Sequence, residues 1–226
     1  MEKCGTDCNR VSIAGTVQTG FEYSHVAYGE KFYTFKLKVV RLKHTADIIP
    51  ILVSEKLVDV TRNYEGLFAR VEGQFRSYNS HWGTKNKLVL TVFAKDISIG
   101  EKTEEDEENN LIILDGFVCK KPVYRRTPFG REITDLLIAV NRSYDKSDYI
   151  PCISWGRNAK YAENFKIGTH IKLEGRIQSR EYVKREGPDN VESHVAYEVS
   201  VRNLNLAEEE TAEEDPEEPE AKLETE

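Results

Sequence analysis

The sequence has no stretch of apolar residues near the roughly 18 that a membrane-spanning helix needs. Its first ten residues, MEKCGTDCNR, contain no apolar segment like that of a signal peptide, so we expect neither a membrane anchor nor export. Enzyme signatures are missing as well, since there is no P-loop, no G-x-S-x-G and no H-E-x-x-H. The five histidines are scattered without a pattern of catalytic partners. We therefore expect a protein that is not an enzyme, with no catalytic residues and no cofactor.

Cysteine is scarce, and the four residues are Cys4, Cys8, Cys119 and Cys152. Because no export signal is present, we expect them to be free thiols in a reducing compartment. Cys4 and Cys8 have a C-x3-C spacing, but a zinc site needs a second Cys or His pair and no matching pair follows. The sequence therefore predicts no metal site.

Positive charge is in short supply only when the whole chain is counted. The formal net charge is −7, yet residues 207–226 hold eleven acidic residues against one Lys, and residues 101–108 hold six against one. Residues 1–100 and 109–206 each carry an excess of four positive charges. Basic domains with acidic extensions are common in proteins that bind polyanions, although the pattern also serves solubility. We expect 101–108 to be a charged linker and 207–226 a disordered acidic tail, because 207–226 has almost no apolar residue to form a core.

The chain repeats itself at a spacing of about 101 residues. The offset becomes 102 after one inserted residue, and the aligned segments are NRVSIAG at 9–15 with NLIILDG at 110–116, Arg41 with Arg142, and VEG at 71–73 with LEG at 173–175. Solenoid repeats are only about 20–50 residues long, so this longer period indicates a duplicated domain. We expect two domains in one chain, residues 1–100 and 109–206.

Both halves are rich in residues that favour β-strands. In the second half, β-prone runs cover 131–142, 149–155 and 170–178, and the last alternates apolar and polar residues at the period of a strand. One helix is expected at Arg157–Phe165, with an equivalent near Glu55–Tyr64 in the first half. Five strands with a helix between the third and the fourth is the plan of the OB-fold, a barrel whose face and loops bind oligonucleotides. We expect an all-β protein with one short helix per domain, built as two tandem OB-fold barrels followed by the acidic tail.

Aromatic and basic side chains are mixed along the second half. Proteins hold single-stranded nucleic acids by stacking bases on aromatic rings within a basic groove, and each stacked base contributes roughly 1–3 kcal/mol. The candidates for stacking are Tyr144, Tyr149, Trp155 and Tyr182, and the candidates for phosphate contacts are Arg125, Arg126, Arg142, Arg176, Arg180, Lys184 and Arg185. The alternative is structural, because an aromatic residue in a strand is by default a core or cross-strand residue.

The second half resembles the bacterial single-stranded DNA-binding protein family over about 97 residues. The pieces that carry the resemblance are, in order, LIILDG, the P-x-G turn at 128–130, AVNRSY, YIPCISWGR, a helix and IGTHIKLEGRIQSREY. The resemblance implies four base-stacking positions, which fall on Tyr144, Tyr149, Trp155 and Tyr182. In the first half the same register gives four residues that are not aromatic, Lys43, Ile48, Ser54 and Ser80, with Tyr78, His81 and Trp82 near the last of them. We therefore expect the first domain to have a degenerate binding face, with Trp82 as its candidate contact.

The resemblance implies sequence-tolerant binding of single-stranded DNA that protects exposed strands in replication, recombination or repair. It also implies a homodimer that presents four OB-folds, in the bacterial cytoplasm with the nucleoid. The acidic tail is the expected contact for replication or repair proteins, although it ends without the short apolar tip common in the family. Two alternatives stay open. One is a specialised primosome or plasmid-type accessory, and the other is an OB-fold module for protein interactions, with Tyr149 and Trp155 at a subunit interface. RNA is also open as a ligand, because stacking accepts every base.

Overall fold

The computed structural model describes residues 8–41, 45–82, 85–102, 110–143, 146–185 and 191–207. Within these ranges, the side chains of 80–82, 85–87, 184, 185, 191 and 192 are not described. The predicted linker, 101–108, and the predicted tail, 207–226, lie almost wholly outside the described residues and stay predictions. No helix in the described ranges is long and apolar enough to cross a membrane.

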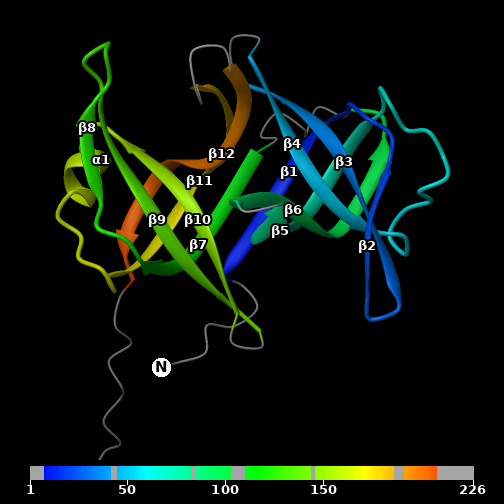
Figure 1. The fold of residues 1–226 in the computed structure, drawn as a ribbon, viewed down its shortest axis with the longest axis horizontal. Helices are drawn as coiled ribbons and strands as arrows, with labels where there is room; N and C mark the ends of the chain where they lie inside the picture. The colour runs from blue at the N-terminus through cyan, green and yellow to red at the C-terminus, as the bar shows by residue number, and fades with distance from the viewer. Residues whose placement is uncertain are drawn as a thin grey trace, which may run out of the picture.

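Strands make up nearly all of the described chain (Figure 1). The first half contains β1 (Asn9–Val17), β2 (Glu22–Ala27), β3 (Glu30–Val40), β4 (Ala46–Ser54), β5 (Phe68–Trp82) and β6 (Lys85–Gly100). The second half contains β7 (Asn110–Val118), β8 (Val123–Arg126), β9 (Glu132–Arg142), β10 (Lys146–Trp155), α1 (Arg157–Ala162), β11 (His170–Arg185) and β12 (Val191–Leu206).

Each half closes into a five-stranded barrel. The first barrel runs β1–β3–β4–β6–β5 and back to β1, and the second runs β7–β9–β10–β12–β11 and back to β7. The pairs β4–β6 and β10–β12 are parallel, and the other pairs are antiparallel. This closed, five-stranded arrangement is that of an OB-fold, so the predicted tandem OB-fold architecture is confirmed. The domain boundaries stay a prediction.

Alternating burial fills the barrels and sets which side chains face outward. In β4, Ile49, Ile51 and Val53 are fully buried, whereas the residues between them are partly exposed. In β11, Ile171 and Ile177 point into the second barrel. Because successive side chains of a strand point to opposite faces, this places the even-numbered residues of β11 on the outer face.

Gly73 of β5 and its equivalent Gly175 of β11 are required because the neighbouring strand passes close to them. The register of β11 against β12 shifts between Glu174 and Gly175, and a Cβ on Gly175 would lie 2.4 Å from the carbonyl oxygen of Ser200. At the equivalent Gly73 of β5, a Cβ would lie 2.1 Å from the carbonyl oxygen of Phe93. Any other residue would therefore push the two strands apart at this point.

The helices differ from the prediction. In the second half, α1 ends at Ala162, three residues before the predicted end at Phe165. In the first half, the helix predicted near Glu55–Tyr64 is wrong, because these residues form turns. There the Asp59 carboxylate accepts hydrogen bonds from the backbone N–H and the hydroxyl of Thr61, at 3.0 and 2.7 Å. Such local side-chain bonds compete with helical backbone bonds and favour turns.

The cysteines also differ from the prediction. Cys8 is disulfide-bonded, whereas Cys119 and Cys152 are free thiols. The prediction that all four cysteines are free thiols is therefore wrong at Cys8. It was inferred from the missing export signal, which does not determine whether two particular cysteines lie close enough to bond. Cys152 lies inside the second barrel, where burial raises its pKa.

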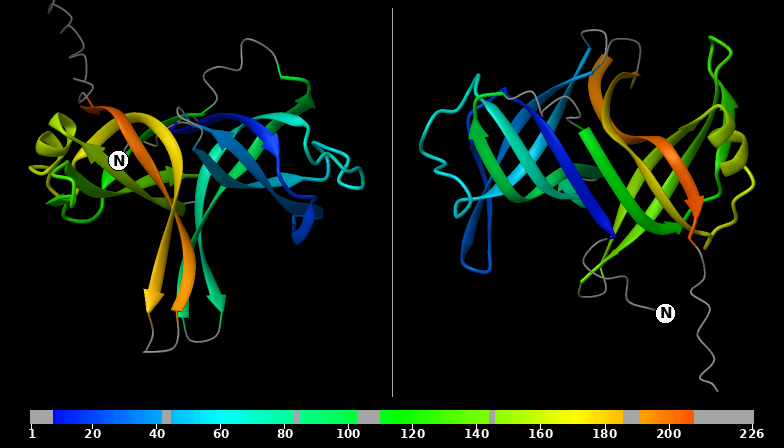
Figure 2. Two further views of the ribbon diagram at one scale, coloured as in Figure 1. Left: turned by 90° about the horizontal axis from the view of Figure 1, so that it is seen from above. Right: turned by 180° about the vertical axis from the view of Figure 1, so that it is seen from behind.

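The two barrels are joined by antiparallel pairing of β1 with β7, in which Val11 lies opposite Ile112. These two residues are equivalent in the repeat, at an offset of 101. An approximate two-fold axis therefore passes between them and relates the halves. Consistent with this axis, the hairpins β5–β6 and β11–β12 extend from the same side of the molecule (Figure 2).

Two equivalent buried carboxylates bridge the barrels on either side of the axis. Asp47 of β4 accepts hydrogen bonds from the backbone N–H and the hydroxyl of Ser179 in β11, at 2.6 and 2.9 Å. Asp148 of β10 accepts a hydrogen bond of 2.8 Å from the backbone N–H of Ser77 in β5. Each carboxylate is also paired with an arginine of its own half, Asp47 with Arg41 and Asp148 with Arg142. The repeat has therefore kept the contacts that hold its two copies together.

These bridges should make a measurable contribution to stability. Asp148→Ala removes the acceptor of the buried Ser77 N–H, so we expect it to lower the free energy of unfolding by about 1–3 kcal/mol in a urea titration at neutral pH. The exposed Asp96→Ala in β6 is the matched control and should change little. Equal stabilities of the two variants would show that the bridge does not stabilise the docked barrels.

The same residue should give a pH dependence. Burial raises the pKa of Asp148 above its ordinary value of 3.8, against the opposing effects of Ser77 and Arg142. A carboxyl whose pKa is raised by folding binds its proton more tightly in the folded state, so ionising it opposes folding. We expect the wild type to lose stability relative to Asp148→Asn as the pH rises from below 3.8 through the folded-state pKa. A pH-independent difference between the two proteins would contradict this.

Candidate nucleic-acid interface

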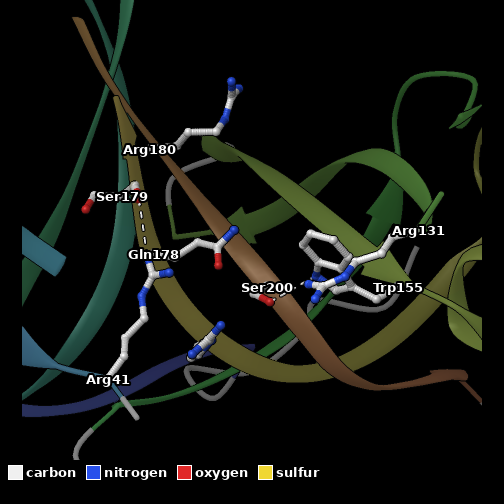
Figure 3. A pocket seen from close by; sticks show the side chains of 8 residues that line it. Arg41, Arg131, Trp155, Gln178, Ser179, Arg180 and Ser200 are labelled. Carbon is white, nitrogen blue, oxygen red and sulfur yellow. Dashed lines mark hydrogen bonds between the residues drawn. The ribbon is translucent and has the colours of Figure 1, made fainter. Parts of the chain in front are cut away.

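A groove of about 450 Å³ lies on the outer face of the second barrel (Figure 3). Eight residues line it, which are Arg41, Arg131, Trp155, Arg176, Gln178, Ser179, Arg180 and Ser200. Trp155 is the last residue of β10, and Arg176, Gln178 and Arg180 follow each other on the outward face of β11. The strand period thus aligns three long polar side chains beside one indole ring.

Trp155 is held in the groove by a hydrogen bond. Its Nε1 donates to the Ser200 hydroxyl of β12 at 3.2 Å, and its ring stays partly exposed. Figure 3 shows Trp155 and Arg131 at the same end of the groove, with Arg180 and Arg41 toward the other end. An indole with one edge anchored and part of its surface open is suited to stacking with a planar ligand.

Three of the four arginines that line the groove have no ion-pair partner among the described residues. Arg131, Arg176 and Arg180 make no ion pair with any carboxylate of the described chain. The pKa of Arg176 is lowered, chiefly by burial and next by the charge of Arg41 nearby, yet an arginine stays protonated at neutral pH. The groove therefore concentrates positive charge that an anion can neutralise.

Arg41 reaches this groove from the first half, just after β3. It is paired with Asp47, and its Nη2 also donates to the carbonyl oxygen of Ser179 at 3.3 Å. Arg41 was not among the site residues predicted from the sequence. The signal that could have found it is its alignment with Arg142, which was a candidate.

Three other candidate arginines are engaged in ion pairs. Arg125 makes a two-pronged contact with Asp135, at 2.6 and 3.1 Å, and this hydrogen bond raises the pKa of Arg125. Arg126 lies 3.2 Å from Glu132, and Arg142 lies 3.6 Å from Asp148. None of the three lines the groove around Trp155.

The structure separates the candidate aromatic residues. Tyr182 lies further along β11, is 38% exposed, and has the Arg180 guanidinium 5.9 Å from its ring centre. Tyr149 lies away from the groove, because its backbone N–H donates to the Ser77 hydroxyl of the first half at 2.7 Å. Tyr144 lies outside the described residues, as do the side chains of Lys184, Arg185 and Trp82.

The second half is similar to proteins of a known family. Residues 109–207 match the model of the single-strand binding protein family. Single-stranded DNA-binding protein A of Bacillus subtilis is 34% identical over 85 residues, which cover 34% of this chain and 49% of that protein. Single-stranded DNA-binding protein 2 of Listeria innocua is 35% identical over 85 residues, which cover 34% of this chain and 54% of that protein. The chain thus spans about half the length of the curated relatives it matches.

Solved structures extend the likeness of fold to both halves. The single-stranded DNA binding protein of Thermus aquaticus superposes with a TM-score of 0.72 at 17% identity, over 93% of this chain and 98% of that chain. A deletion mutant of that protein gives a TM-score of 0.66 at 19% identity. At these identities the likeness concerns the fold, which the tandem barrels share along nearly their whole length. Residues 109–207 are thus similar to the single-strand binding protein family, and both halves share the fold of a solved single-stranded DNA binding protein.

Proposed function

We propose that the chain binds single-stranded DNA in the groove around Trp155 and so protects exposed strands during replication, recombination or repair. The observation that carries the proposal is an anchored, partly exposed indole beside three arginines, Arg131, Arg176 and Arg180, without a described carboxylate partner. A base stacks on the indole, while the guanidinium groups neutralise the flanking phosphates. Because every base has a flat π-face, such binding tolerates any sequence.

Binding is assigned to the second half because the first half carries opposite chemistry at the equivalent positions. Ser54 stands where the second half has Trp155, and Glu30 stands where it has Arg131. The Ser54 hydroxyl donates to Glu30, and Lys56 lies 3.1 Å from the same carboxylate. These contacts lower the pKa of Glu30, so this position holds an ion-paired carboxylate where the second half holds the unpaired guanidinium of Arg131.

Assembly and location are proposed from the family resemblance. We propose a homodimer that presents four barrels, located in the bacterial cytoplasm with the nucleoid, and an acidic tail that contacts replication or repair proteins. Light scattering with and without a dT oligomer tests the dimer. A monomeric mass under both conditions would contradict it.

Tryptophan fluorescence tests the groove directly. The chain has two tryptophans, so Trp82→Phe leaves Trp155 as the sole indole emitter. We expect oligo-dT to quench this emission, because a stacked base contacts the ring. An unchanged emission under conditions where the same protein still binds the oligomer would favour a site elsewhere, and an unchanged emission without binding would favour the protein-interaction module.

Trp155→Ala tests the energy of stacking. We expect its affinity for oligo-dT to fall by about 5–150-fold, which corresponds to the roughly 1–3 kcal/mol of one stacked base. Tyr161→Ala is the matched control, because this exposed ring lies on α1 and does not line the groove. Equal affinities of the two variants would contradict stacking on Trp155.

The salt dependence of binding tests the arginines. Each phosphate neutralised on a single strand contributes about −0.7 to the slope of log affinity against log salt. Arg176→Gln should therefore make the slope shallower by about 0.7, as should Arg180→Gln. Arg157→Gln, an exposed arginine of α1, should leave the slope unchanged. A slope that responds equally to all three substitutions would indicate general attraction rather than contacts in the groove.

A further inference from the structure

The hairpin formed by β8 and β9 carries an open aromatic ring at its tip. Phe129 is 93% exposed, and its ring contacts no other aromatic ring among the described side chains. The hairpin projects from the second barrel beside α1 (Figure 1). Because water around a bare phenyl group is unfavourable, a ligand that covers this ring gains free energy.

The tip is held in one shape by hydrogen bonds to a single residue, Thr127. Its N–H donates to the carbonyl oxygen of Arg131 at 2.8 Å, and its carbonyl oxygen accepts the N–H of Gly130 at 2.8 Å. Its hydroxyl accepts the N–H of Arg131 at 3.1 Å. Pro128 further restricts the backbone directly before Phe129. The ring is therefore positioned before a ligand arrives, which lowers the entropy lost on binding.

The hairpin is continuous with the groove around Trp155. Arg131 belongs to both, since it ends the turn and lines the groove. Trp155 lies opposite Ile133 in the pairing of β10 with β9, and Phe129 is four residues before Ile133, which is at most about 14 Å of chain. Figure 3 places Arg131 and Trp155 at the same end of the groove. A strand that leaves the groove at this end therefore passes close to the tip.

The hairpin is also strongly basic. Residues 120–131 hold five basic residues and no acidic one. Arg125 and Arg126 are paired with carboxylates of β9, whereas Lys120 and Lys121 are exposed and make no ion pair within the described chain. A DNA duplex carries about one negative charge per 1.7 Å of its axis, which is twice the density of one of its strands. The charge of the hairpin thus suits a duplex that continues from the groove.

The first half has the same tip with different surroundings. Tyr28 is equivalent to Phe129 at the offset of 101 and is fully exposed at the tip of the β2–β3 hairpin. Residues 19–30 of that hairpin, however, hold two acidic residues and no Lys or Arg. An exposed ring is therefore common to both halves, but only the second half combines it with positive charge and a groove that holds an indole.

We propose that Phe129 stacks on the terminal base pair of a duplex whose unpaired strand lies in the groove, so that the chain binds junctions between single- and double-stranded DNA. This inference rests on the proposed function, because the groove must hold the unpaired strand. The end of a duplex presents a flat surface of two paired bases, and the isolated ring at the tip has space to cover it. The basic residues of the hairpin lie beside the duplex phosphates.

Partial duplexes test this junction contact. The substrates are a dT strand of about 8 nucleotides, which one OB-fold can cover, and the same strand joined to a blunt duplex at its 5′ or at its 3′ end. A strand in the groove has one direction, so only one of the two partial duplexes brings its base pairs to Arg131. We expect the wild type to bind this one about 5–150-fold more tightly than the dT strand in fluorescence anisotropy, as one stacked aromatic contact allows. The other partial duplex adds the same phosphates and controls for general attraction.

Three variants identify the ring that makes the contact. Phe129→Ser should remove the preference for the one partial duplex and leave the affinity for the dT strand unchanged. Phe129→Tyr keeps a ring, as the first half does at this position, and should keep the preference. Tyr28→Ser is the matched control, because it removes the equivalent exposed ring from the hairpin without basic residues. It should bind all three substrates like the wild type.

The possible failures can be told apart. Equal affinities of the wild type for the two partial duplexes would contradict the junction contact. It is also wrong if Phe129→Ser keeps the preference, or weakens binding of the dT strand as much as that of the partial duplex. In each of these cases the groove stands, provided that Trp155→Ala weakens binding of the dT strand. If the wild type binds none of the three substrates, the proposed function itself fails.

Discussion

The antiparallel pairing of β1 with β7 is the constraint on which the rest of the arrangement depends. By placing Val11 opposite Ile112, it sets the approximate two-fold axis and thereby decides which edges of the barrels meet. The start of β4 then lies against β11, and the start of β10 lies against β5, where Asp47 and Asp148 form their bridges. The outer face of the second barrel is therefore not wholly its own, because Arg41 of the first half borders the groove.

The two halves have kept their framework and changed their surfaces. Asn9 binds both the N–H and the carbonyl oxygen of Phe75, at 2.9 and 2.7 Å, and its equivalent Asn110 binds those of Ile177 at 2.9 and 2.8 Å. These amides lie within each barrel's own β-sheet, where replacing one would leave buried backbone groups unpaired. On the outer faces no such penalty applies. There Trp155 of the second half corresponds to Ser54 of the first, and Arg131 corresponds to Glu30.

The barrels could be predicted from the sequence because strand alternation and the repeat are signals that lie along the chain itself. The offsets of 101 and 102 align Asp47 with Asp148 and Ser77 with Ser179, and the two bridges join Asp47 to Ser179 and Asp148 to Ser77. The sequence does not indicate which surface residues of one half lie against the other half. Arg41 was missed, and Tyr149 was grouped with Trp155, because their places depend on the docking of the barrels rather than on their own strands. The first-half helix failed for a different reason, since Asp59 and Asn63 bond the backbone locally and favour turns.

The equivalence of Val11 and Ile112 at the axis has a further consequence. In an assembly of identical subunits, a residue on a two-fold axis meets its own copy, so each substitution appears twice and must be compatible with itself. Here the partners are encoded separately, and one side of the junction can vary while the other compensates. In a covalently joined pair, the two sides of the junction therefore need to complement each other but not themselves. The two copies can then acquire different surfaces while they stay docked.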